Sequence, residues 1–277
     1  MRVLDRINRK TWVWVLAPLV FLGFDAAFAL TLPLPPATWG NPDQPWGRRR
    51  DVTAQDREHI AAFRSGHKTP SYATDFRDAA KFQSDWAPQA DNPSSLLACR
   101  QPANVSPGNS GLSLKTLPTT ACGPAKKWAT GTVWSKFTTG YGFYEARIRI
   151  ADISGINNAF WVVTKGYEID IAEVHYPGDL GISLHNWTTG KDQSVGFKRV
   201  LKDDLSKGFH DYGMLWTPDE IVMEIDGEPV AAIVTHGSVA GELQTRFSTA
   251  LAPFAGKVPD NPAGHDVIVS WFKFYTL

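Results

Sequence analysis

Residues 141–152 read YGFYEARIRIAD, and this stretch has a strict two-residue repeat. Its apolar positions Tyr144, Ala146, Ile148 and Ile150 are separated by charged side chains. Successive side chains of a β-strand point to opposite faces, so this pattern puts an apolar row on one face and a charged row on the other. The repeat therefore predicts a strand with one face on a hydrophobic core.

Similar strands are expected before and after this stretch, and turn signals such as TPDE and DGE separate some of them. Helical periodicity is nearly absent, and a short helix over 56–65 is compatible with the sequence but not required by it. Many short antiparallel strands over about 200 residues predict an all-β fold, a sandwich or jelly roll. The further expected strands lie at 111–117, 159–163, 211–216, 220–226, 229–234 and 265–277.

The composition is that of a folded protein with no charge bias. The chain has 277 residues, of which 43% are hydrophobic and 20% are charged, with 28 basic and 28 acidic side chains. This zero net charge gives no indication of a nucleic-acid partner. The 11 Trp and 15 Phe residues are many for this length. They could stack on flat ligands such as sugar rings, or they could fill the core.

The N-terminus has the layout of a secretory signal peptide. Basic residues occur up to Lys10, an apolar run covers 12–24, and the small residues Ala27 and Ala29 flank Phe28. We expect cleavage after Ala29, which predicts a secreted or periplasmic protein without stable membrane insertion. An uncleaved anchor is the alternative, although the apolar run is short for a membrane span.

Three segments are expected along the chain. Residues 1–29 form the signal peptide, and 30–70 form a Pro-rich extension that includes three consecutive arginines at 48–50. Such a composition predicts an extended or polyproline-like segment. Residues 71–277 form the β domain, which we expect to be a monomer.

Export also gives a meaning to the two cysteines, Cys99 and Cys122. A disulfide between them would close a loop of intermediate length and stabilise the fold by ~3 kcal/mol. Two free buried thiols are the alternative. Two cysteines without clustered histidines do not make a zinc site, and no metal ligands are predicted.

Three carboxylates interrupt the apolar stretch GYEIDIAEVHYPG at 166–178. Glu168 and Asp170 share one face of a strand, but Glu173 is out of phase and would enter the core. A β-bulge near Ala172 would restore the phase and bring all three acids to one face. The apolar residues fit this register on both sides of the bulge.

The predicted arrangement suits acid–base chemistry. Four strand steps separate the Cα atoms of Glu168 and Glu173 by about 13 Å, and leaning side chains could bring the carboxyls to roughly 5–6 Å. That is the separation in a retaining glycosidase, in which one carboxylate attacks the anomeric carbon and the other protonates the leaving oxygen. Asp170 lies between them and could keep one glutamate protonated. The alternative is that the acids line a solvated face.

Several motifs in the same order resemble glycoside hydrolase family 16, and the resemblance covers about 71–277. EIDIAE resembles the family's E-x-D-x-x-E signature in its bulged form. YGFYEARIRI and FHDYGMLWTPDEIVMEIDGEPV resemble two further family strands and hairpins, and the stretches 74–86 and 104–116 resemble its opening strands. The stretch GINNAFW is closer to bacterial exopolysaccharide and mixed-linkage glycanases of the family than to its laminarinases.

The resemblance implies a jelly-roll sandwich (concanavalin-like) with a sugar-binding cleft on its concave face. It implies that Glu168 is the nucleophile, Glu173 the general acid/base and Asp170 the auxiliary acid. No cofactor is required, although family members often carry a structural calcium ion away from the cleft.

Six further residues are candidates for binding the polysaccharide. His185 resembles a cleft histidine of the family, and the others could stack on sugar rings or bond hydroxyls. Trp161 and His185 could instead belong to the core or to a strand, and Trp134 fits either role. The full set of candidates is Asn158, Trp161, Tyr167, His185, Trp187 and Trp134.

The predicted function is a secreted, endo-acting, retaining β-glycanase. Its expected substrate is a β-1,3- or mixed β-1,3/1,4-linked glucan, or a related exopolysaccharide. A transglycosylase could use the same site, because the two activities differ only in the acceptor that resolves the intermediate. A non-catalytic polysaccharide-binding protein on this fold is the third hypothesis.

Overall fold

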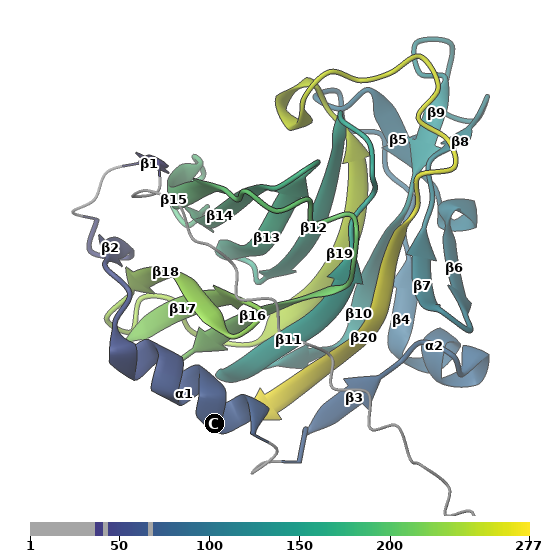
Figure 1. Cartoon of the computed structure of the whole chain (residues 1–277). Helices are drawn as coiled ribbons and strands as arrows, with labels where there is room; N and C mark the ends of the chain where they lie inside the picture. Colours follow the sequence, from purple (N-terminus) through teal and green to yellow (C-terminus); the bar gives the residue numbers. More distant parts are fainter. Residues whose placement is uncertain (1–36, 41–43, 66–68) are drawn as a thin grey trace, which may run out of the picture.

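The computed structural model describes residues 37–40, 44–65 and 69–277 and contains two large, stacked β-sheets (Figure 1). The predicted signal peptide lies outside the described residues, as does part of the segment 30–70. No helix in the described part of the chain is both long and apolar enough to cross a membrane.

The first sheet has eight antiparallel strands in the order β1-β15-β14-β13-β12-β19-β10-β4. In that order their bounds are Ala37–Trp39, Gln193–Val200, Asp179–Asn186, Tyr167–His175, Ile156–Val163, Leu243–Leu251, Thr132–Thr139 and Trp86–Pro88.

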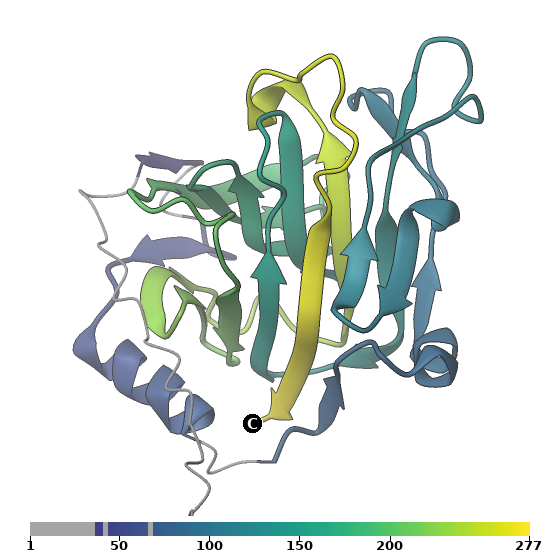
Figure 2. The same ribbon diagram turned by 45° about the vertical axis from the view of Figure 1, so that its right-hand side comes forward.

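The second sheet has nine strands, in the order β2-β18-β17-β16-β11-β20-β7-β6, and β3 pairs with β20 on the edge opposite β11. Strand β20, the yellow strand that ends at the C-terminus in Figure 2, lies between β11 and β7. In the order given, with β3 last, the bounds are Arg48–Arg50, Glu228–Val234, Glu220–Ile225, His210–Trp216, Gly142–Arg149, Val267–Thr276, Gly111–Leu114, Val105–Gly108 and Tyr72–Thr74.

A small third sheet and four short helical segments complete the fold. The small sheet has the order β5-β9-β8, with bounds Ala98–Arg100, Trp128–Thr130 and Leu117–Pro118. The helices are α1 (Ala54–Arg64) and α2 (Ala79–Asp85), and the 3₁₀ turns are η1 (Pro102–Asn104) and η2 (Pro253–Ala255).

The core lies between the two large sheets, where aromatic rings from both sheets meet. Phe160 and Phe247 of the first sheet stack with ring centroids 4.9 Å apart, and Phe272 of the second packs edge-on 6.0 Å from each. Trp86 and Trp216 are fully buried, so part of the tryptophan content fills the core. The all-β jelly-roll prediction is confirmed.

The possible helix near 56–65 is present as α1, and it packs on the second sheet. Thr53 caps its first turn, in a capping box with Asp56. Ile60 and Phe63 face a separate apolar cluster on the sheet. Residues 48–64 of the N-terminal segment therefore pack on the β domain, because β2 pairs with β18 and α1 covers the second sheet.

The two cysteines form a disulfide, with Cα atoms 5.7 Å apart. Cys99 lies on β5, and Cys122 lies in the turn segment between β8 and β9, so the bond links β5 to the β8–β9 connection. Both sulfurs pack against Ala129 in a small buried cluster. The disulfide prediction is confirmed.

Candidate active site

The predicted β-bulge is present in β13. Against β12, Phe160 pairs with Ala172 but Trp161 pairs with Asp170, so one residue of β13 has no partner. The pairing with β14 shifts between Asp170 and Glu173. The bulge leaves Ile171 and Ala172 buried and returns Glu173 to the outer face of the sheet, as the sequence pattern predicted.

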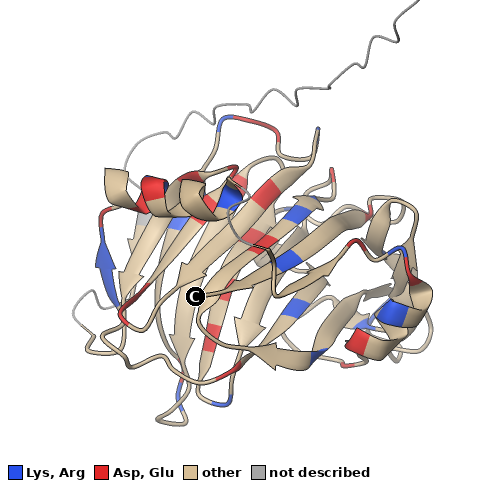
Figure 3. Ribbon diagram, turned by 90° about the horizontal axis from the view of Figure 1, so that it is seen from below, with Lys and Arg blue, Asp and Glu red and all other residues tan. Residues whose placement is uncertain are grey.

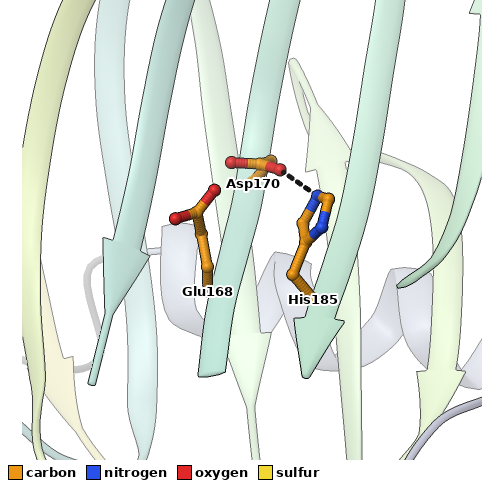
Figure 4. A group of neighbouring side chains, drawn as sticks. All are labelled: Glu168, Asp170 and His185. Carbon is orange, nitrogen blue, oxygen red and sulfur yellow. Dashed lines mark ion pairs between the residues drawn. The ribbon is translucent and has the colours of Figure 1, made fainter. Parts of the chain in front are cut away.

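Asp170 is the most buried of the three acids, and it contacts its neighbours on β14. It is 5% exposed and accepts a hydrogen bond from Ser183 Oγ. Its Oδ2 lies 3.2 Å from His185 Nε2 (Figure 4). His185 Nδ1 lies 2.9 Å from Asp192 Oδ1, so a carboxylate faces each ring nitrogen.

His185 is held as a cation by these contacts. Burial lowers its pKa, but Asp170 and Asp192 outweigh that effect and raise the pKa to about 9. The side chains of Glu168, Asp170 and His185 lie within 4.8 Å of one another. As a metal site, this group would require His185 to give up the proton that Asp170 and Asp192 stabilise, because metal ligation uses a neutral imidazole.

Glu168 and Glu173 both have raised pKa values. Burial, and then the charge of Asp170, raises the pKa of Glu168 to about 7 and that of Glu173 to about 8. The His185 cation lowers both values. Two carboxyls that remain partly protonated near neutral pH suit a pair in which one acts as a base or nucleophile and the other as an acid.

Asn157 of β12 orients Glu173, and the sequence reasoning missed it. Asn157 Nδ2 donates to Glu173 Oε1 over 2.6 Å, and His175 Nε2 lies 3.1 Å from Asn157 Oδ1. A donated proton from His175 would fix the amide with its NH₂ group toward Glu173.

The prediction chose the neighbouring Asn158, and this choice was wrong. Asn158 is 3% exposed, and its side chain bonds the backbone of Ala151, Ile156 and Val174. The physical reason is the strand period of two, which puts Asn157 on the same face as Trp161 and Asn158 on the opposite face. That parity was available from the sequence.

Tyr167 also lies on the wrong face for the predicted role. It is adjacent to Glu168 in a strand, so the two side chains point in opposite directions, and Tyr167 packs against the main core. The prediction that it stacks on sugar is therefore corrected.

The three predicted tryptophans contact either His185 or Arg246. Trp187 is 41% exposed, and its ring is nearly parallel to that of His185, with centroids 5.9 Å apart. Trp161 and Trp134 are half-buried, and both contact the guanidinium of Arg246, which the sequence reasoning did not single out. Its position became visible only with the pairing of β10, β12 and β19.

Comparisons with known proteins identify the family of this chain. Residues 100–271 match the profile of Glycosyl hydrolases family 16. A relative from Rhizobium meliloti, named Endo-1,3-1,4-beta-glycanase EglC, is 30% identical over 53% of this chain. Xyloglucan endotransglucosylase/hydrolase protein 2 of Arabidopsis thaliana is 31% identical over 35% of this chain. These matches span about a third of each relative's own length: 32% and 35%.

Solved structures show the same fold. A laminarinase from Flavobacterium sp. UMI-01 has a TM-score of 0.64 and 21% identity, over 75% of this chain and all of its own. A Bacteroides ovatus family 16 protein in complex with a G4G4G3G product has a TM-score of 0.63 and 19% identity, over 73% of this chain and 99% of its own. The profile match covers well over half of the sequence, and the chain belongs to glycosyl hydrolases family 16.

Proposed function

We propose that this protein is an exported, endo-acting β-glycanase that retains anomeric configuration. Its substrate is a β-1,3- or mixed β-1,3/1,4-linked glucan or a related exopolysaccharide. The observation that carries the proposal is the row of Glu168, Asp170 and Glu173 on the outer face of β13, in a family 16 domain. The names of the R. meliloti relatives support the linkage class.

In the first step, the Glu168 carboxylate attacks the anomeric carbon while Glu173 gives its proton to the leaving glycosidic oxygen. The raised pKa of Glu173, about 8, keeps this acid protonated at neutral pH. Glu168, with its pKa near 7, is ionised in a large fraction of molecules, helped by the nearby His185 cation. The part of the polysaccharide that carries the original reducing end leaves with the proton from Glu173. The other part remains bound to Glu168 as a glycosyl ester.

In the second step, Glu173 acts as the base. Once Glu168 is esterified it carries no charge, so a repulsive charge that had raised the pKa of Glu173 is lost. Glu173 then takes a proton from water, the hydroxide oxygen bonds to the anomeric carbon, and the bond to Glu168 breaks. The two inversions give net retention.

The release of reducing ends from polysaccharides by the exported chain tests the proposed activity. N-terminal sequencing of that chain tests export, and we expect its first residue to be Leu30. The panel contains laminarin, mixed-linkage glucan, xyloglucan and bacterial exopolysaccharides. We expect cleavage of at least one, and a loss on the order of 10³-fold or more in Glu168→Gln. The control is Glu58→Gln, an exposed acid on α1. Equal activity of Glu168→Gln and the parent would refute the proposed nucleophile.

A transglycosylase is the second candidate, favoured by the match to the A. thaliana endotransglucosylase/hydrolase. The two candidates share the first step and differ in whether water or a sugar hydroxyl attacks the ester of Glu168. Products longer than the supplied oligosaccharide would identify transfer, and a product carrying ¹⁸O from labelled water would identify hydrolysis.

A further inference from the structure

The catalytic acids belong to a row of side chains that crosses the first sheet. Asp170 on β13 pairs with Trp161 on β12, Trp161 pairs with Arg246 on β19, and Arg246 pairs with Trp134 on β10. Directly paired residues lie on the same face, so this row continues the outer face that carries Glu168. Arg246 is two strands from Asp170, about 10 Å at the usual strand spacing.

The two tryptophans hold the guanidinium between them. The Arg246 Cζ atom lies 3.8 Å from the ring centroid of Trp134 and 4.6 Å from that of Trp161. Its Nε donates to Gln244 Oε1 over 3.0 Å. Trp161 is itself fixed by a hydrogen bond from Nε1 to Ser248 Oγ. These contacts hold the guanidinium in a defined orientation on the half-exposed face.

Within the described residues, Arg246 forms no ion pair with a carboxylate, and its two terminal nitrogens have no hydrogen-bond acceptor, although the charge of Glu168 acts on it from a greater distance. Two other half-buried arginines have carboxylate partners: Arg50 with Asp56 at 2.7 Å, and Arg100 with Asp91 at 2.6 Å. A third, Arg199, donates from Nε to the backbone carbonyl of Val230. Burial lowers the pKa of Arg246 to about 10, which is the effect expected for a cation whose lost hydration is incompletely replaced.

We propose that Arg246 is a specificity-determining residue that binds a carboxylate substituent of the polysaccharide near the bond that is cleaved. The planar, forked guanidinium can form two parallel hydrogen bonds to a carboxylate. The flanking indoles can stack on neighbouring sugar rings. The inference rests on the proposed function, because it assigns an acidic polysaccharide as the preferred substrate of the same site.

The test compares two forms of one polymer: mixed-linkage glucan, and the same glucan with a fraction of its primary hydroxyls oxidised to carboxylates. For each enzyme variant, kcat/KM on the acidic form is divided by kcat/KM on the neutral form. Any effect of Arg246 on the ionisation of Glu168 acts on both substrates, so it cancels in this ratio.

We expect Arg246→Gln to lower the ratio by about tenfold or more, and Arg246→Lys to give an intermediate value, because a point charge remains without the fork. Added salt should lower the parent's ratio. The control, Arg77→Gln, removes an exposed arginine whose partner is Asp75 and should leave the ratio unchanged. An unchanged ratio in Arg246→Gln, or equal losses on both polymers, would overturn the proposal.

Binding gives a readout that does not need cleavage. Affinity electrophoresis of Glu168→Gln and of Glu168→Gln/Arg246→Gln in gels that contain each polymer measures the same preference. We expect the second substitution to weaken retention by the acidic polymer selectively. If the parent cleaves neither polymer, mixed-linkage glucan is not its substrate, and this binding result alone supports or overturns the role of Arg246. The proposed function itself fails only if no polymer of the panel above is cleaved.

Discussion

The electrostatics of the site depend on Asp170, which is buried between the two glutamates. Its charge raises the pKa of both Glu168 and Glu173, after the larger effect of burial. Its contact with the His185 cation in turn limits that rise. Asp170 and His185 therefore influence the pKa values of Glu168 and Glu173 through their charges, without needing to contact the reacting atoms.

This arrangement gives a pH prediction for Asn157→Ala. In the parent, kcat/KM should fall below about pH 7, where Glu168 gains a proton, and above about pH 8, where Glu173 loses one. The hydrogen bond from Asn157 favours ionised Glu173, so its loss should move the alkaline limb to higher pH and lower the maximum by about tenfold.

The acid limb serves as the internal control, because Asn157 does not contact Glu168. It should move less than the alkaline limb when both are measured on one substrate across pH 5–10. An alkaline limb at the parent's position, or at lower pH, would show that Asn157 does not orient the acid.

At this scale the sequence predicted the acids better than their partners. The alternation of Ile169, Ile171 and Val174 with the acids was enough to place the bulge and the outer face. Asn157 could have been chosen from the strand period alone. Arg246 could not, because its contacts come from strands β10 and β12, far away in the sequence, and their register depends on the packing of the whole sheet.

At the scale of elements, the small sheet β5-β9-β8 depends on its disulfide. Among the described residues, its buried apolar cluster consists of Cys99, Cys122 and Ala129, and its strands have two or three residues each. Such short strands bury little surface of their own. The disulfide was predicted from the sequence, because the chain has two cysteines and is expected to be exported. The pairing of β5 with β9 was not, because it is parallel and has no local sequence signal.

Removing the disulfide should therefore lower stability without changing the jelly roll. The bond closes a loop with a sequence separation of 23 residues, for which chain entropy gives ~3 kcal/mol. We expect Cys99→Ala/Cys122→Ala to lower the free energy of unfolding by about that amount in urea titrations. The parent measured under a reducing agent is the control and should approach the double variant. Coincident curves for oxidised parent and double variant would contradict this expectation.

At the scale of the whole molecule, α1 is joined to the second sheet by a buried ion cluster as well as by apolar contacts. Arg64 at the end of α1 lies 2.8 Å from Glu145 and 2.9 Å from Glu224, on strands β11 and β17. Asp211 of β16 lies 3.5 Å from Arg64. Figure 3 shows acidic and basic positions side by side on the strands next to this helix.

The pairing is essential because the carboxylates cannot be solvated. Burial raises the pKa of Glu145 and Glu224, the latter to about 8, and Arg64 opposes this rise. Removing one partner of a buried ion pair typically costs 3–5 kcal/mol, since the other charge is left uncompensated. The sequence showed an arginine near the end of a possible helix, but no nearby sequence feature indicated that its side chain contacts acids on three strands.

We expect Arg64→Met to lower the free energy of unfolding by ~3–5 kcal/mol at pH 8 and by less at pH 5.5. A carboxyl whose pKa is raised in the folded state binds its proton more tightly than in the unfolded state, so stability falls as pH rises from about 4.5 toward the folded pKa. Without Arg64 these pKa values rise further, which extends that fall to higher pH. Urea unfolding at the two pH values measures it, with the exposed Arg57→Met as control. A loss independent of pH would indicate that Arg64 acts by packing alone.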